Sequence, residues 1–325
     1  MTNGIQMFNY NREAPWIGVG VKGQWTDPAE ALHAGRLDYN VIPKDAKVEI
    51  VDPYNTGFGA SIVKYETVPG VQVNLQEGTN KILGCVSDRY GIIQNKEAFE
   101  LLRPFTDAGG IITNVGMTEQ GLCFMVLRMR QSNILGDDWD FDVMCTNSFN
   151  GMFPCSLIMV PTRIICQNMY RKMMGNHDSL LHVRHGFFAK ERIQAAQSAT
   201  AGVLSFQAAF ENQIELAGSK AFDVIDVQNI LLPMLFPYPK PGGTREVMSR
   251  ERIDMLREEF MDTYYDAPDN TKYHGKALGF INAYYDYLSH RNPTKNMPGS
   301  WADRRLSGLI SGNDIKTNVI KAAMK

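Results

Sequence analysis

The hydrophobic period of the chain changes once, near residue 163, and this change constrains the fold more than any other feature. Before that point, apolar and polar residues alternate in short runs such as Lys47–Val51 and Val71–Leu75, as they do in half-buried strands. After Arg163, apolar residues recur about every 3.6 positions, which is typical of amphipathic helices. Strands in one half and helices in the other predict an α+β protein.

The element boundaries follow from caps and turn residues. Thr26 or Asp27 is expected to cap a helix that has Pro28 in its first turn and ends at Gly35, and an N-capped helix is expected over Asn95–Leu102. Strands are expected over Ser61–Tyr65, Lys81–Ile93 (as a pair), Ile111–Thr118, Leu122–Met129, Phe141–Asn147 and Leu157–Val160. Helices are expected over 164–174, 189–216, 222–232, 246–264, 274–290 and 301–324.

Proline and glycine suggest how the chain is divided. Four prolines and the pair Gly242–Gly243 lie between residues 233 and 243, which predicts a linker. We therefore expect an extended N-terminal arm over 1–25, an α+β core over 26–232, the linker, and a helical C-terminal region over 244–325.

Composition excludes several protein classes. Hydrophobic residues make up 44% of the 325 residues and the net charge is −2, so general disorder is excluded. No apolar stretch is long enough to span a membrane, and no signal peptide is visible, so we expect a cytoplasmic protein. The five cysteines are odd in number and lack C-x-x-C spacing, which favours buried free thiols over disulfides or a structural zinc site.

Two motifs that could bind a cofactor or metal have simpler interpretations. Gly18, Gly20 and Gly23 match G-x-G-x-x-G, but Pro15 precedes them and the helix starts too late, so a flexible turn is expected. The acidic group at 137, 138, 140 and 142 lacks the glycine and final glutamate of an EF-hand loop, so a solvated turn is expected. No G-x-S-x-G, H-E-x-x-H or Walker A sequence occurs.

A group of histidines leaves a second possibility open. His177, Asp178, His182 and His185 lie within nine positions, but their spacing is not a regular metal-ligand spacing, so we expect neither a metal nor a cofactor. Cys166 has apolar neighbours and is expected to be an inert buried thiol. An enzyme with its site around 177–185 remains the alternative function.

The near-neutral total charge hides a local asymmetry. Residues 163–192 hold six basic and two acidic residues, whereas residues 245–266 hold four basic and seven acidic ones. Proteins that bind single strands need cations for phosphates and flat rings on which bases stack. The basic window supplies both residue types, and the predicted contacts are Arg163, Asn168, Tyr170, Arg171, Lys172, Arg184, His185, Lys190 and Arg192.

Several stretches together resemble a known family, the phage- and plasmid-borne Domain-of-Unknown-Function 932 proteins, also called the phage/plasmid-like family. The most specific blocks are Tyr90–Phe99 and Arg163–Asn168. Further similarity lies in Trp16–Gly20, Val86–Asn95, Thr146–Gly151, Val183–His185, Gly279–His290 and Arg304–Gly312. Ile17 and Phe149 replace histidines that are usual in the family, which removes two imidazoles from any catalytic or metal site.

The resemblance implies a genomic setting in which DNA arrives or persists as single strands. Single-strand annealing proteins of the Rad-fifty-two type use a curved β-sheet with a helix across it and assemble into rings or filaments, and a distant relationship would fit this layout. We therefore expect a non-enzymatic single-stranded DNA-binding and annealing protein in the bacterial host cytoplasm. It would act as a homo-oligomer in recombination or in protecting incoming DNA.

Two questions stay open from the sequence. The chain could instead inhibit a host defence component by binding it, because its 17 methionines would suit an adaptable apolar surface. The late block could be an oligomer contact or a second strand-binding surface; it contains Tyr284, Tyr285, Tyr287, His290, Arg304 and Arg305.

Overall fold

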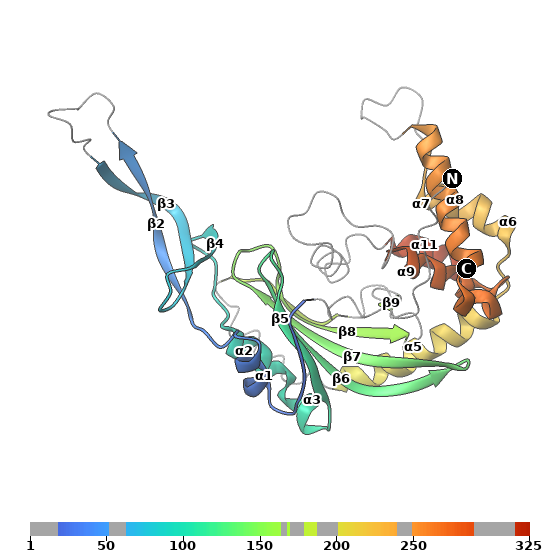
Figure 1. Ribbon diagram of the computed structural model, residues 1–325, viewed down its shortest axis with the longest axis horizontal. Coiled ribbons are helices and arrows are strands. Elements are labelled where there is room, and N and C mark those ends of the chain that lie inside the picture. Colours follow the sequence, from blue (N-terminus) through green and yellow to red (C-terminus); the bar gives the residue numbers. More distant parts are fainter. Residues whose placement is uncertain are drawn as a thin grey trace, which may run out of the picture.

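A computed structural model describes residues 19–51, 63–163, 168–169, 179–186, 201–238, 249–288 and 316–325. Antiparallel sheets fill the N-terminal half and helices lie mostly beyond residue 200, which confirms the α+β prediction. A curved sheet forms the floor of the molecule. A long β-hairpin and a group of C-terminal helices rise from its two ends (Figure 1).

The large sheet is antiparallel, and its strands follow the order β1-β5-β6-β7-β8-β10, with β9 paired to the far end of β8. The strands are β1 (Val21–Trp25), β5 (Ile111–Met117), β6 (Leu122–Ile134), β7 (Asp137–Ser148), β8 (Cys155–Arg163), β9 (Asn168–Met169) and β10 (Ser179–Val183). A two-residue turn joins β6 to β7, and both of its residues have positive φ, 52° at Leu135 and 79° at Gly136. This geometry matches the right-handed twist of the long strands that it connects.

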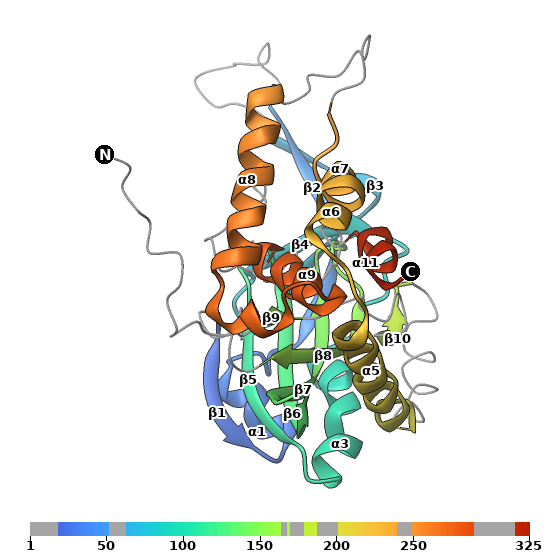
Figure 2. The ribbon, with the colours of Figure 1, turned by 90° about the vertical axis from the view of Figure 1, so that its right-hand side faces the viewer.

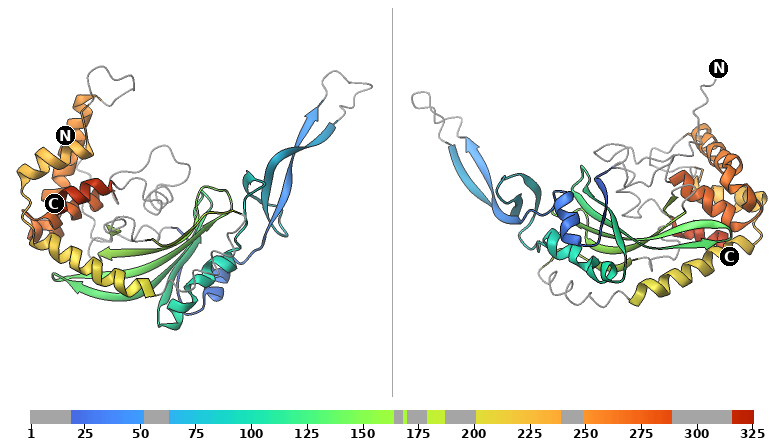
Figure 3. Two further views of the ribbon diagram at one scale, coloured as in Figure 1. Left: turned by 180° about the vertical axis from the view of Figure 1, so that it is seen from behind. Right: turned by 60° about the horizontal axis from the view of Figure 1, so that its bottom comes forward.

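Alternation along the strands separates two apolar clusters. Odd-numbered residues of β6, such as Cys123 and Met125, belong to the main core with the helices. Even-numbered residues, such as Phe124 and Val126, form a second cluster with Met144 and others on the opposite face. The helices cover the convex face, so the second cluster lies on the concave face (Figure 3).

The convex face carries helices from both halves of the chain. They are α1 (Pro28–Ala34), α2 (Asn95–Phe99), a 3-10 turn (Glu100–Leu102), α3 (Arg103–Asp107) and α5 (Ala201–Ser219). Of the two residues expected to cap α1, Asp27 is the N-cap, and its carboxylate accepts a hydrogen bond from the backbone N–H of Ala29 at 2.8 Å. From α5, Phe210 packs edge-on against Trp139 and Phe141 of β7.

A second, three-stranded sheet has the order β2-β3-β4, with β2 (Val41–Val51), β3 (Val63–Gln76) and β4 (Ile82–Ser87). The strands β2 and β3 extend beyond β4 as a two-stranded hairpin (Figure 1). Pro69 and Gly70 fall where the register between β2 and β3 shifts, and they form a bulge within the single strand β3.

The C-terminal helices pack against one another at one end of the large sheet (Figure 2). They are α6 (Val224–Asp226), a π-helical turn (Val227–Leu231), α7 (Leu232–Leu235), α8 (Arg250–Asp266), a 3-10 helix (Pro268–Tyr273), α9 (Ala277–Asp286) and α11 (Thr317–Met324). Their buried residues belong to the same core cluster as the sheet. Phe236, inside the predicted linker, contacts Phe260 and Tyr287. None of the helices that the structure describes is long and apolar enough to cross a membrane.

Several local predictions differ from the structure. Asn168 and Met169 form a strand in a segment predicted to be helical, and the second strand expected within Lys81–Ile93 is replaced by a turn. The glycine motif leads into β1, where Gly20 lies against the backbone of Gly116, so close strand packing explains this glycine better than a flexible turn.

Candidate nucleic-acid interface

Arg163, the first predicted phosphate contact, is the last residue of β8 and exposes none of its side chain. Its guanidinium binds two carboxylates, with Nη2 2.8 Å from Asp137 Oδ2 and Nη1 2.8 Å from Asp269 Oδ2. A guanidinium that is covered and doubly paired cannot reach a phosphate, so the role predicted for Arg163 is wrong. Arg163 instead connects the large sheet, through Asp137 of β7, to the C-terminal helices, through Asp269.

The other described members of the predicted basic surface are divided between the two ends of β8. The backbone of Asn168 pairs with Arg163, whereas Arg184 and His185 follow β10, which pairs with the opposite end of β8. A strand rises by about 3.3 Å per residue, so the nine residues of β8 separate the two ends by roughly 25 Å. Five further predicted contacts lie outside the described residues and stay predictions: Tyr170, Arg171, Lys172, Lys190 and Arg192.

His185 stacks inside the protein rather than presenting an open ring. Its imidazole lies 4.7 Å from the ring of Tyr90 at an interplanar angle of 13°, and its Nδ1 lies 3.2 Å from the carbonyl oxygen of Gly91. Burial lowers the pKa of His185 to about 4, so the ring is neutral at pH 7. One face of the ring is therefore occupied, and His185 adds no positive charge.

Two exposed arginines flank this stacked pair. Arg89 precedes Tyr90 and Arg184 precedes His185, and both side chains are exposed. The two segments touch through their backbones as well, because a Cβ on Gly91 would lie 2.2 Å from the carbonyl oxygen of Gly186. We call the segments 89–91 and 184–186 the junction. It combines two cations with a fixed aromatic pair at one edge of the large sheet.

A buried polar network supports the junction from below. The phenolic O–H of Tyr90 donates to the carbonyl oxygen of Ser148 at 2.8 Å. Asn147 donates to Asn95 Oδ1 at 3.0 Å and to the carbonyl oxygen of Ile93 at 2.9 Å. Two of the sequence blocks that carry the family resemblance therefore meet in this network. A buried, largely satisfied network of this kind fixes the relative position of the segments it joins.

The loop after β7 joins the same network to the base of the hairpin. Asn74 of β3 donates to the carbonyl oxygen of Phe149 at 2.7 Å, and a Cβ on Gly84 of β4 would clash with the backbone at 149–150. Phe149 is 2% exposed, and its ring lies 6.2 Å from that of Tyr39. The side chain that replaces the usual histidine is therefore part of the core.

The acidic group of β7 is buried rather than solvated, contrary to expectation. Asp137, Asp140 and Asp142 expose 7%, 4% and none of their surface, and only Asp138 is exposed. Arg128 pairs with Asp140 at 2.7 Å and with Asp142 at 3.3 Å. Burial raises the pKa of Asp142 to about 7, although the nearby guanidinium of Arg128 opposes this shift.

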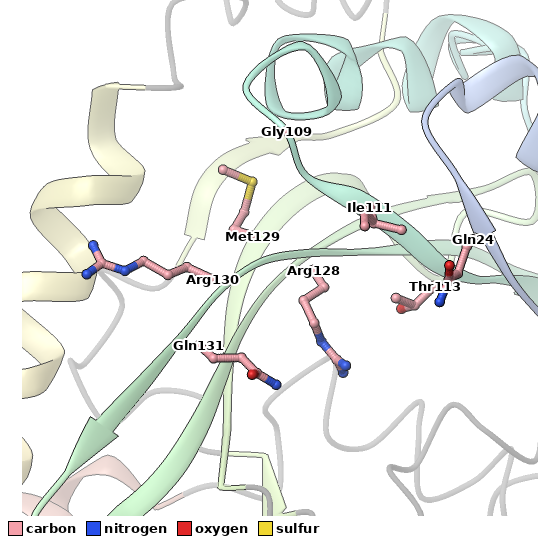
Figure 4. A pocket seen from close by; sticks show the side chains of 8 residues that line it. All are labelled: Gln24, Gly109, Ile111, Thr113, Arg128, Met129, Arg130 and Gln131. Atoms are coloured by element: carbon pink, nitrogen blue, oxygen red, sulfur yellow. The ribbon is translucent and has the colours of Figure 1, made fainter.

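A pocket of about 240 Å³ lies beside this charged group, where a bulge in β6 shifts the register between Arg128 and Arg130. Arg128 and Gln131 point to one side of the strand, whereas Met129 points to the other (Figure 4). The lining residues are Gln24, Gly109, Ile111, Thr113, Arg128, Met129, Arg130 and Gln131. Two guanidinium groups and two amides could hold an anion, but the carboxylates of Asp140 and Asp142 already engage Arg128.

The alternative metal or catalytic site has no support among the described residues, which contain no group of three or more histidine, cysteine or acidic side chains placed to hold a metal ion. His177, Asp178 and Cys166 lie outside them, and His182 is exposed. Three thiols are buried as predicted, at Cys123, Cys145 and Cys155, but Cys85 is exposed. Tyr284, Tyr285 and Tyr287 are buried core residues, so none of the three can serve as a stacking surface.

The sequence reasoning missed Arg89, Arg128 and Arg130. Arg89 lies in the Val86–Asn95 block that carries part of the family resemblance, and it is next to an aromatic residue, so the sequence does contain a signal for this position. Charge gives no signal for Arg128 and Arg130, because residues 128–140 hold three acidic and only two basic residues. Only strand pairing brings Arg128 to the buried carboxylates.

Comparison with known proteins gives a family and no activity. No curated protein and no solved structure matches the chain significantly. One family model, described as a domain of unknown function (DUF932), matches residues 82–307, which include the junction, the buried network and most of the large sheet. With more than two-thirds of its length covered, the chain belongs to the DUF932 family.

Proposed function

We propose that this chain is a non-enzymatic protein that binds and anneals single-stranded DNA, acting as a homo-oligomer in recombination or in protecting incoming DNA. The observation that supports the proposal is the junction. Arg89 and Arg184 are exposed, and each directly precedes one residue of the Tyr90–His185 stack in the sequence. Exposed cations that bind phosphates are one of the two features that a single strand requires, and the stacked rings of Tyr90 and His185 hold the two segments together rather than receive bases.

Binding would rest on the release of counterions and on a fixed geometry. Each phosphate that an arginine neutralises frees condensed cations, so affinity falls as salt rises. The buried network beneath Tyr90 fixes the segment that carries Arg89, and the stacking of His185 on Tyr90 joins the segment that carries Arg184 to it, which lowers the backbone entropy lost on binding. A backbone held by its phosphates leaves base edges free to pair with a second strand, which is the step that annealing needs.

The proposal is tested by fluorescence anisotropy with a labelled 30-nucleotide polythymidine at several salt concentrations between 50 and 200 mM. The Arg89→Ala, Arg184→Ala double variant should bind at least roughly tenfold more weakly at 50 mM salt, and its salt slope should fall by about 1.4, or 0.7 per lost contact. The matched control is Lys96→Ala with Arg252→Ala, two exposed cations on α2 and α8.

The experiment distinguishes two questions: whether the protein binds single-stranded DNA, and whether the junction makes the contact. No binding by the wild-type protein at 50 mM salt overturns the proposed function. If the junction double variant binds the oligonucleotide as tightly as the control variant does, the junction is not the DNA contact. Annealing is measured separately, as the rate at which two complementary labelled oligonucleotides pair with and without protein, and a rate that the protein does not raise removes the annealing activity.

A further inference from the structure

The hairpin formed by β2 and β3 has an edge that no described strand covers. In the described part of the chain, β2 pairs only with β3. Beyond the bulge at Pro69 and Gly70, the hairpin stands away from the body of the molecule (Figures 1 and 3). Val48 is 47% exposed on β2, and Tyr65 is 64% exposed on β3.

A two-stranded ribbon of this kind is marginally stable by itself in water, whereas three or more strands with an apolar face are stable. An open edge also presents unpaired N–H and C=O groups that pair readily with another strand. Pro43 lacks an N–H and interrupts such pairing near the base of β2. The pairing edge is therefore the distal part of β2, around Lys47, Val48 and Glu49.

These three residues are complementary to their own reversed copy. If β2 pairs antiparallel with β2 of a second copy about a two-fold axis at Val48, Lys47 of each strand lies opposite Glu49 of the other. Val48 then faces its own counterpart. Opposite charges directly across an antiparallel pair stabilise it, and like charges destabilise it. Lys47 and Glu49 are exposed and form no ion pair with any described residue.

We propose that two copies of this chain dimerise by pairing the distal edges of β2, so that the hairpins form a continuous four-stranded sheet with the order β3-β2-β2-β3. Glu49 lies opposite Tyr65 and Lys47 opposite Thr67 across the existing ladder. One face of the joined sheet would thus carry a row of Tyr65, Glu49, Lys47 and Thr67, the last two from the second copy. The self-complementary charges favour a second copy over any other partner.

The inference deepens the oligomeric part of the proposed function and rests on it, but it does not require DNA. An isologous contact closes at two copies, so a ring or filament would need a second, different contact. The dimer would be the unit from which such an assembly grows.

The test exchanges the charges and measures the molecular mass by analytical ultracentrifugation without DNA. Lys47→Glu places Glu opposite Glu at two positions, and Glu49→Lys places Lys opposite Lys. Each single variant should raise the dimer dissociation constant at least about tenfold. The double variant, Lys47→Glu with Glu49→Lys, restores both pairs and should dimerise like the wild type. The control is Lys96→Glu, an equal charge change on α2.

A mixture gives the most specific result. The Lys47→Glu chain carries two glutamates and the Glu49→Lys chain two lysines, so the two variants should form a heterodimer although neither forms a homodimer. Circular dichroism of each variant checks that it is folded. Single variants that dimerise like the wild type, or a mixture that stays monomeric, overturn the proposal. DNA binding measured on the same samples shows independently whether the proposed function stands.

Discussion

Arg163 and Tyr273 bind the same carboxylate oxygen of Asp137. The guanidinium Nη2 lies 2.8 Å from Oδ2 and the phenolic oxygen 2.7 Å from it, while Lys272 Nζ lies 2.7 Å from Oδ1. Lys272 and Tyr273 also donate to the carbonyl oxygen of Leu135, whose φ of 52° is unusual for a leucine. The β6–β7 turn, the end of β8 and the helix before α9 are therefore held at one buried point.

Removing Arg163 should strongly destabilise the protein. Arg163→Met keeps the length of the side chain but leaves Asp137 without its guanidinium partner, and breaking a buried ion pair on one side costs about 3–5 kcal/mol. The free energy of unfolding, measured by urea denaturation, checks this. Arg252→Met on the exposed face of α8 should change it little. Equal stability of the two variants would show that the pair contributes nothing measurable.

His185 should make the protein less stable as the pH falls. Its pKa is about 4 in the folded protein because the ring is buried, and about 6.5 when unfolded. Between these values the unfolded chain binds more protons, so the free energy of unfolding should decrease from pH 6.5 to 4, by on the order of 3 kcal/mol. The His185→Phe variant keeps a ring beside Tyr90 and should lack this decrease. An NMR titration in which His185 gains its proton near pH 6.5 would contradict the prediction.

Asp142 should have the opposite effect. Burial raises its pKa to about 7 from a value near 4, so the folded protein binds more protons between these limits and loses stability as the pH rises. Asp142→Asn resembles the protonated carboxyl group and should be more stable than the wild type at pH 8, by up to about 4 kcal/mol. The difference should shrink as the pH falls to 4. An asparagine variant that is less stable than the wild type at pH 8 would show that the charged pair with Arg128 outweighs burial.

Two glycines at the junction offer a matched comparison. A methyl group on Gly91 would meet the carbonyl oxygen of Gly186 at 2.2 Å, whereas a methyl group on Gly186 has no neighbour within 4 Å. Gly91→Ala should force the two segments apart at a cost of about 1–3 kcal/mol, and Gly186→Ala should be nearly neutral. As the segments separate, the ring of His185 gains solvent, so its pKa should rise toward 6.5 in the first variant only. NMR titration measures this shift, and identical titrations in both variants would contradict the packing.

The candidate site was only partly predictable from the sequence. His185 stacks on Tyr90, which lies 95 positions earlier and follows Arg89, so the basic window does not contain the segment against which His185 packs. The net charge of a short sequence window depends only on residues that are close to one another in the chain. It cannot show that Arg163, at the other end of β8, is buried, because Asp269, which pairs with it, lies 106 positions away.

The change of hydrophobic period by itself determined the α+β layout and most strand and helix positions, because alternation and helical spacing are properties of neighbouring residues. The capped start of α1 at Asp27 and Pro28 is local in the same sense. Only the tertiary structure decided which charges are covered, that the acidic group of β7 is buried against Arg128, and that β2 keeps a free edge among the described strands. Burial depends on which distant segment packs against a side chain, and that information is absent from any short stretch of sequence.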